Sequence, residues 1–558
     1  MAIKISQLPV GAKPPFNGDE LVALVEDPRG SASTTRASLS SAMTYLSGAT
    51  DGVGMPVLAA RQKNNHFSEK QTMGSSLTVE GTLSGTENLV VGTSIAYCTP
   101  TLGSVGGGTA HCIGGSYSTI GGGRGNKTTN DCVTIGGGCN NIVTCDQATI
   151  GGGVDNRVDV CSTGTIGGGS GNRSCGEAGV VGGGCSNAAG ANYSTVAGGC
   201  NLSAFGCGST VSGGTSGCAI VAGSTVGGGV ENVAGGGCAT IAGGYLNKVT
   251  GTVAFIGGGS TNTAPGLSSF IGGGSSNCAC GEGSVIVGGV NNQACGVNSF
   301  IGAGQTNTAF CSNTVVVGGT TNCTASLSSF IGGGAGNTIT ADAGNAIVGG
   351  ENNTITECGY ANFIGAGNFN RTSGCYSSVV GGKGNNATGS AMCAIIVGGL
   401  SNRVENNFDT IVGGCSNTVT GCGNSFVGGG GCNNIGSDTC YSTVVGGFSN
   451  QIQGACMTFG FIGGGCCNNI GGCDSAHGVI AGGINNCVCA NNAIIAGGCN
   501  NIVSHDRAAI IGSDITSVGA EMLHAKCLYL SAGALPTSDP SIAGVVWRCG
   551  TDLKISVG

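Results

Sequence analysis

The sequence contains little charge and few aromatic side chains. Only 8% of its 558 residues are charged and 4% are aromatic, with a single Trp, whereas a soluble protein usually has about 25% charged residues. Disordered chains are rich in charge and poor in apolar residues, so the positive mean hydropathy of +0.25 argues against that class. A core without aromatic rings must be filled by Val, Ile, Ala and Cys, so we do not expect a conventional enzyme core.

Several other features are also missing. The sequence has 9 Pro and no strict Gly-X-Y period, which excludes collagen. It has no run of 18 apolar residues, so we expect no membrane insertion. The net charge is −8 and no basic stripe is present, which argues against nucleic acid as a partner. The first 15 residues contain no apolar run of the kind found in secretory signals, so we expect synthesis in the cytoplasm.

Glycine, in contrast, is abundant (116 residues), and its positions repeat. An Ile or Val followed by a Gly-rich triplet recurs from Val105 to Ile510, and we call this aliphatic residue the anchor of each repeat. Of the 26 intervals between successive anchors, 18 are 15 residues long and the others are 16 to 18, so the repeat is a structural unit. Representative anchors are Ile120, Ile135, Ile150, Ile256, Ile271, Ile301, Ile411 and Ile495.

A second mark repeats in phase with the first. Between the anchors Ile120 and Ile510, 23 of 26 repeats carry Asn six residues after the anchor. Asn tolerates the left-handed turn conformation, so we expect these residues to have positive φ. Asn side chains stacked in successive repeats can also form a hydrogen-bonded ladder. Representative turn residues are Asn126, Asn141, Asn156, Asn262, Asn277, Asn417 and Asn501.

The 15-residue period predicts an all-β fold, a parallel β-solenoid or β-roll. Fifteen residues are too few for a helical hairpin, and each Gly disfavours a helix by about 1 kcal/mol. The same length accommodates two short strands and two turns, with the anchor pointing inward. At about 4.8 Å per coil, about 28 coils would form a rod of about 130 Å. We expect the shaft at residues 90–515, after a docking domain (1–50) and a connector (51–89) and before a C-terminal cap (516–558).

The repeat resembles the heads of trimeric autotransporter adhesins over about residues 90–515. In that family, short Gly-containing repeats form parallel β-rolls, and three chains pack about one axis. The resemblance therefore implies a homotrimer. The sequence shows no coiled-coil stalk or membrane-anchoring barrel of that family, so we expect a different biological context.

The two ends suggest that context. Residues 4–9 (KISQLP), 18–25 (GDELVALV) and 35–40 (TRASLS) resemble, in this order, the N-terminal segment of bacteriophage tail-fibre proteins, which docks the fibre onto the virion. Residues 65–72 and 77–82 resemble the linker that often follows, and residues 535–540, 543–547 and 553–556 resemble the endings of phage structural proteins. The resemblance implies docking through Leu8, Pro9, Asp19, Leu21, Leu24, Arg36 and Leu39.

The resemblance implies a virion structural protein made in the host cytoplasm. Residues 1–50 would bind tail, baseplate or adaptor proteins, and the fibre would bind a host cell-surface receptor during adsorption. Two alternatives stay open: a decoration fibre attached to the virus head, and a cell-surface adhesin or matrix fibre. We expect no enzymatic activity, no cofactor and no metal, because the five His have no catalytic neighbourhood and the carboxylates are scattered.

The 33 Cys allow more than one interpretation. Cys can act as a small hydrophobe that fills a narrow core. Alternatively, disulfides can form between coils or chains, because adjacent coils at about 4.8 Å place equivalent residues within disulfide reach. Metal binding is disfavoured because the Cys-X-Cys pairs at residues 278–280 and 487–489 have no His nearby.

Overall fold

The computed structural model describes residues 102–159, 162–357, 359–389, 391–454, 457–472, 476–526, 535–543, 546–549 and 552–557, together with strands β1 to β4. The chain divides into two units, residues 1–85 and 86–558. In the first unit, β1 (Glu20–Glu26) and β2 (Ala32–Ser38) form an antiparallel hairpin, in which Glu20 lies opposite Ser38.

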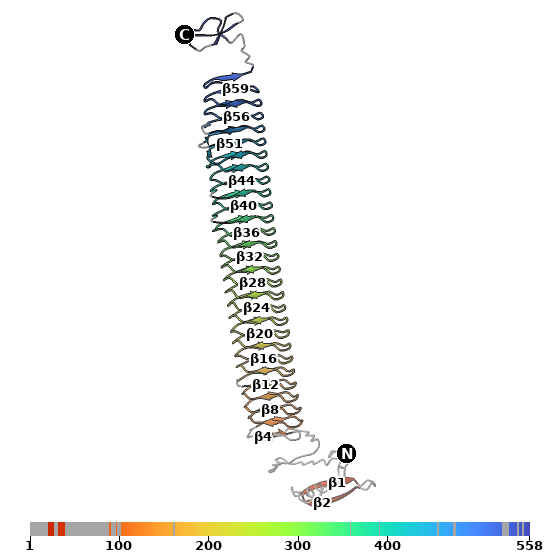
Figure 1. Ribbon diagram of the computed structural model, residues 1–558. Helices are drawn as coiled ribbons and strands as arrows, with labels where there is room; N and C mark the ends of the chain where they lie inside the picture. Colours follow the sequence, from red (N-terminus) through yellow and green to blue (C-terminus); the bar gives the residue numbers. More distant parts are fainter. Residues whose placement is uncertain are drawn as a thin grey trace. The chain divides into compact units, whose positions relative to one another are not determined.

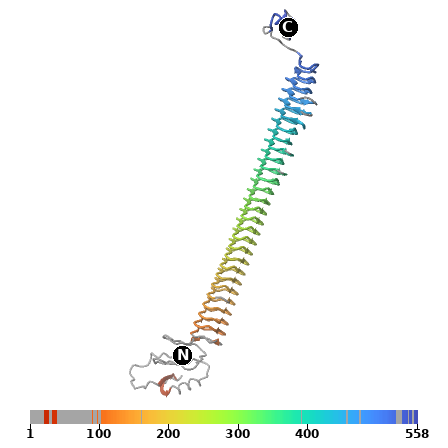
Figure 2. The same cartoon turned by 90° about the vertical axis from the view of Figure 1, so that its left-hand side faces the viewer.

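The second unit contains the predicted parallel β-solenoid, which is confirmed with about 27 turns. Successive coils stack on one another, as Figures 1 and 2 show, with strands labelled in Figure 1. Each coil adds one short strand to each of two parallel sheets. Short strands suit this repeat because Gly-rich segments must turn the chain within a few residues of each strand.

The first sheet, called the anchor sheet, runs from β3 (Leu89–Val90) and β5 (Ser104–Val105) to β59 (Ala509–Ile511) and β60 (Leu523–Ala525). Between β5 and β57 (Ile494–Ile495), each strand consists of an anchor and the residue before it. The anchor is buried, and the preceding residue points outward, as alternation along a strand requires.

The second sheet runs from β4 (Ala96–Tyr97) to β58 (Ile502–Val503). From β6 (Cys112–Ile113) onward, its strands consist of the seventh and eighth residues after an anchor. Two of them, β51 (Gln451–Gln453) and β54 (Asn469–Gly471), are one residue longer. The eighth residue is buried in each coil and faces the anchors across the core.

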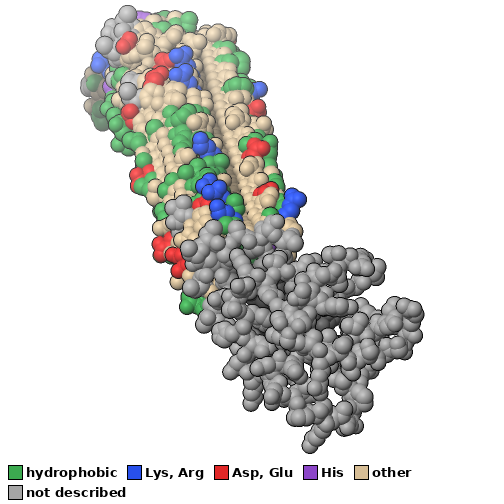
Figure 3. Space-filling model, turned by 90° about the horizontal axis from the view of Figure 1, so that it is seen from below, with side chains coloured by type: hydrophobic (Ala, Val, Ile, Leu, Met, Phe, Trp, Pro, Cys, Tyr) green, Lys and Arg blue, Asp and Glu red, His purple; other side chains and the backbone are tan. Residues whose placement is uncertain are grey.

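Pairing between coils is in register throughout. In the anchor sheet Ile256 pairs with Ile271, and in the second sheet Ala234 pairs with Val249. A third row of single bridges joins the fourth residues after successive anchors, as between Cys185 and Cys200. Equivalent side chains therefore follow one another along the stack. Figure 3 shows hydrophobic side chains interspersed with a few charged ones on the face of the stack that is seen there.

The last part of the chain forms a separate small element. Strands β61 (Val546–Cys549) and β62 (Asp552–Ile555) pair antiparallel, and Val546 lies opposite Ile555. Trp547, expected in a terminal cap, lies on β61. Among the described residues, no helix is long and apolar enough to cross a membrane.

Candidate functional site

The anchors form the apolar wall of the core. All eight representative anchors are fully buried, and so are the aliphatic or Ala residues that face them from the second sheet. The core contains Val, Ile, Ala and one Leu, with Cys145 as its only Cys among the described residues. A core one side chain deep is sufficient because each coil also contacts the coils on both sides.

The Asn six residues after each anchor form a buried ladder. Asn277 is representative: its backbone N–H donates to Oδ1 of Asn262 (3.0 Å), and its own Oδ1 accepts from the backbone N–H of Asn292 (3.0 Å). Its Nδ2 donates to the carbonyl oxygens of Gly273 (3.0 Å) and Gly289 (2.9 Å). The same arrangement recurs at the other turn Asn residues, so each amide satisfies buried backbone groups in its own coil and the next.

The expectation that these Asn residues have positive φ is wrong. Positive φ falls on the residue before each Asn, such as Ser276 (φ 56°) before Asn277. Many residue types occupy that position, because a single left-handed residue needs no hydrogen bond from its own side chain here. The Asn side chain instead points inward and binds backbone carbonyls, which is a different reason for its selection.

Gly is essential at one position of the turn, the third after the anchor. Gly274 has φ +92°, and a Cβ there would lie 2.1 Å from the carbonyl oxygen of Gly289 and 2.7 Å from Nδ2 of Asn277. Gly273, one residue earlier, has nothing within 4 Å of such a Cβ. The coil spacing and the Asn ladder therefore both depend on the Gly at the third position.

The first described rung of the ladder is a His. His111 stands six residues after the anchor Val105 and is 1% exposed. Its Nδ1 accepts from the backbone N–H of Asn126 (3.3 Å), and its Nε2 donates to the carbonyl oxygen of Gly107 (3.1 Å). A neutral imidazole protonated on Nε2 thus reproduces the acceptor and the donor of an Asn amide.

Most Cys in the described part of the chain are partly or fully exposed, so the core-filling interpretation is wrong for most of them. Two disulfides join adjacent coils, Cys280–Cys295 and Cys422–Cys440. Of the free Cys among the described residues, only Cys145 is buried. Nowhere in the described part of the chain do three His, Cys, Asp or Glu gather to hold a metal ion.

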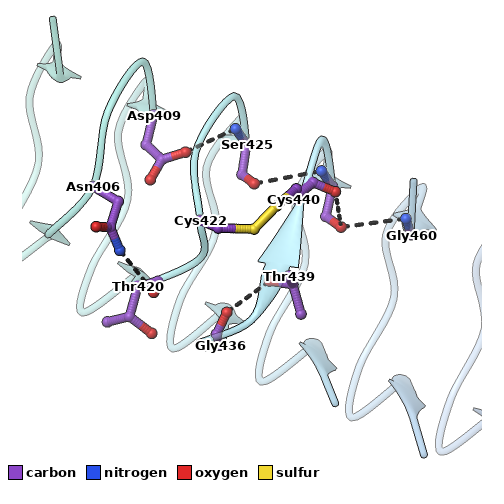
Figure 4. The surroundings of a disulfide bond; sticks show 10 residues. Asn406, Asp409, Thr420, Cys422, Ser425, Gly436, Thr439, Cys440 and Gly460 are labelled. Atoms are coloured by element: carbon purple, nitrogen blue, oxygen red, sulfur yellow. Dashed lines mark hydrogen bonds between the residues drawn. A yellow bond between two sulfur atoms is a disulfide. The ribbon is translucent and has the colours of Figure 1, made fainter. Parts of the chain in front are cut away.

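The Cys422–Cys440 disulfide lies beside a buried polar row (Figure 4). Oδ1 of Asp409 accepts from the backbone N–H of Ser425 (2.8 Å), and Oγ of Ser442 accepts from the backbone N–H of Gly460 (3.2 Å). These residues stand two positions before successive anchors, on the opposite side of the coil from the Asn ladder. The row is a second, shorter ladder between coils.

Asp409 is the one carboxyl in that row. It is fully buried, and its Oδ2 has no hydrogen-bond partner among the described residues. Burial raises its pKa from the ordinary value of 3.8 to about 7, and the hydrogen bond from Ser425 opposes part of this change. Asp409 therefore exchanges a proton near neutral pH.

The coils after Asp409 also have the longest turns. The extra residues form two short strands, β49 (Thr439–Cys440) and β52 (Met457–Thr458), which pair in parallel. The ring of Phe459 stacks on Tyr441 (centroids 5.3 Å apart) and on His477 (5.1 Å). Tyr441 and Phe459 are each about half exposed, so the three rings form an accessible aromatic row across three coils.

Few residues of the implied docking set fall in the described structure. Leu21 and Leu24 lie on β1 and Arg36 lies on β2, whereas Leu8, Pro9, Asp19 and Leu39 are outside the described residues. Comparison of the chain with protein-family models and with curated proteins gives no match. The function must therefore be argued from the fold and its surfaces.

Proposed function

We propose that the protein is a structural virion appendage, a tail fibre with no enzymatic activity. Residues 1–50 attach it to the tail or baseplate, and the solenoid extends toward the host. The observation that carries this proposal is the uninterrupted in-register stack, in which two sheets and a bridge row join successive coils and the Asn ladder adds hydrogen bonds between most of them. Such cross-bracing resists bending, which suits a spacer between a particle and a surface.

Adsorption requires accessible contact groups as well as a stiff spacer. The aromatic row of Tyr441, Phe459 and His477 supplies them, because flat rings bind apolar faces of sugars and side chains with little loss of conformational entropy. In a homotrimer, three copies of this row would act together, and avidity would raise the net affinity without any new contact.

The attachment site is tested by gold-labelled antibodies against residues 1–50 on intact virions. Gold at the tail supports the tail fibre, whereas gold at the head identifies a decoration fibre. Absence from virions together with labelling of the bacterial surface overturns the proposal in favour of an adhesin.

The contact site is tested by adsorption competition with the purified full chain. We expect the wild-type chain to block virus adsorption and the double variant Tyr441→Ala, Phe459→Ala to block it at least about tenfold less well. The matched control is Tyr193→Ala, Phe205→Ala, which removes two equally exposed rings outside the row. Equal loss in both double variants would refute a specific role for the aromatic row.

A further inference from the structure

The outward face of the anchor sheet changes character along the stack. In the coils from β7 (Thr119–Ile120) to β23 (Thr240–Ile241), the residue before the anchor is Thr in all but one coil. From β25 (Phe255–Ile256) to β57 the same position is mostly Phe, Val or Ile. The residues just before and just after the anchors in these sixteen coils include no charged side chain. We call this face, residues 255–496, the apolar stripe.

The side chains of the stripe reach a similar height above the sheet, because the residue before each anchor and the residue after it are matched in size. In the seven coils with Phe before the anchor, the residue after the anchor is Gly, and in the nine others it is Val or Ala. A Cβ on each of those Gly residues would lie 3.2 to 3.5 Å from Cε1 of the Phe, so the ring lies over the Gly. The Phe–Gly pairs are Phe255–Gly257, Phe270–Gly272, Phe300–Gly302, Phe330–Gly332, Phe363–Gly365, Phe426–Gly428 and Phe461–Gly463.

The exposed area of the stripe is that of a stable interface. The more exposed Phe rings are 36–38% exposed, and the Val residues after the anchors are 41–50% exposed. Since an aromatic side chain presents about 150–250 Å², each coil leaves about 70 Å² of apolar surface open, or about 1,100 Å² per chain. A standard interface buries about 800 Å² per partner, whereas soluble monomers rarely expose contiguous apolar patches of more than a few hundred Å².

We infer that the apolar stripe is covered by further copies of this same chain. A partner must be flat and uncharged over about 77 Å, the length of sixteen coils at about 4.8 Å per coil. A second solenoid of the same sequence meets these requirements, because its own stripe has the same length, the same rise per coil and the same level surface. Within the proposed homotrimer, on which this inference builds, the stripe identifies the contact face.

The test is the mass of the full chain by sedimentation equilibrium, with reductant present so that exposed thiols do not link chains. The stripe variant is Val287→Lys, Val317→Lys, Val348→Lys. The matched control is Val154→Lys, Val230→Lys, Val290→Lys, three Val residues of similar exposure (39–47%) on the bridge row. Val287 and Val290 belong to the same coil. The two variants therefore have the same composition and differ only in which face of the coil carries the three Lys residues.

We expect wild type and control to sediment as the same multiple of 53.5 kDa. The stripe variant should dissociate to the single chain, with a rise in Kd of at least about tenfold. Circular dichroism checks that it is folded. If it is not, the triple Val→Thr variant, which keeps the β-branched shape, replaces it and should weaken assembly in the same direction.

Three results would overturn the inference: a wild-type chain that is monomeric at all concentrations, a stripe variant that keeps its oligomeric mass, and a control that dissociates equally. None of these measurements involves a virion. Failure of the virion-appendage proposal would therefore leave the mass result standing, and failure here would leave the attachment test standing.

Discussion

Replacing Asp409 by Asn should remove a pH-dependent loss of stability from the coils around the Cys422–Cys440 disulfide. The carboxyl is buried, and its pKa rises from 3.8 to about 7 in the folded chain. The folded state therefore holds the proton more tightly than the unfolded state. The resulting stabilisation is full below pH 3.8, falls as the pH rises, and is lost once the pH passes about 7.

The size of the effect follows from the two pKa values. Each pH unit between them corresponds to about 1.4 kcal/mol, so ionisation of Asp409 costs these coils at most about 4 kcal/mol at alkaline pH. In the Asn variant, Oδ1 can still accept from the backbone N–H of Ser425. Asn345 and Asn362 occupy the same row in earlier coils, so the amide fits there. We expect a net gain of about 1–3 kcal/mol at pH 8 after allowing for an unpaired Nδ2.

Hydrogen exchange is the appropriate assay because a long solenoid does not unfold as one unit. Protection of backbone amides in residues 405–430 should fall between pH 5 and pH 8 in the wild type, after correction for intrinsic exchange rates. The Asp409→Asn variant should show no such fall. Asp438→Asn, which changes an exposed carboxyl nearby, should behave like the wild type. An unchanged pH dependence in Asp409→Asn would refute the assignment of the effect to this carboxyl.

Three further predictions concern the coil itself. Gly274→Ala should lower local stability by about 3 kcal/mol or more by hydrogen exchange, because the new Cβ meets a backbone carbonyl at positive φ, whereas Gly273→Ala should change it by less than about 1 kcal/mol. Asn277→Ala should cost about 3 kcal/mol in the same assay, since it leaves the carbonyl of Gly273 and the N–H of Asn292 unpaired and removes one of the two hydrogen bonds to the carbonyl of Gly289. Equal protection in variant and wild type would contradict the ladder. Cys422→Ser should cost about 3 kcal/mol in guanidinium unfolding of residues 405–460 and abolish the effect of added reductant there.

The repeat and its core could be predicted from the sequence because both depend on period alone. A β-branched residue every 15 positions has to face inward if each coil forms a strand at the same place, and Ile256 and Ile271 do so. The ladder was also predictable, because in-register stacking brings equivalent Asn residues together.

Features that depend on the direction in which a side chain points could not be predicted as well from the sequence. The sequence places Asn277 in a turn but cannot distinguish a left-handed residue from one that points inward, and the left-handed residue is Ser276. The burial of the Cys side chains could not be predicted for the same reason, since the size of Cys suits a thin core and an exposed row equally well. The proton-binding Asp409 was missed because one Asp among Ser residues gives no periodic signal, although its position two residues before an anchor marks it as buried.

The level surface of the apolar stripe is a relation between two positions, so neither position reveals it alone. In one coil Phe330 precedes the anchor and Gly332 follows it, because the ring of Phe330 occupies the space above Gly332. In the adjacent coil the small Ala346 precedes the anchor, and the larger Val348 follows it. A face that contacts only water does not need side chains of matched height, since water molecules fill any surface shape. A face that packs against another protein surface does need matched height, because gaps between packed side chains lose dispersion contacts. Before Phe255 the corresponding pairs are mostly Thr with Gly, Ala or Ser, which form a narrower and more polar face. The anchor sheet thus has two halves suited to different neighbours, water over the first and a matching solenoid over the second.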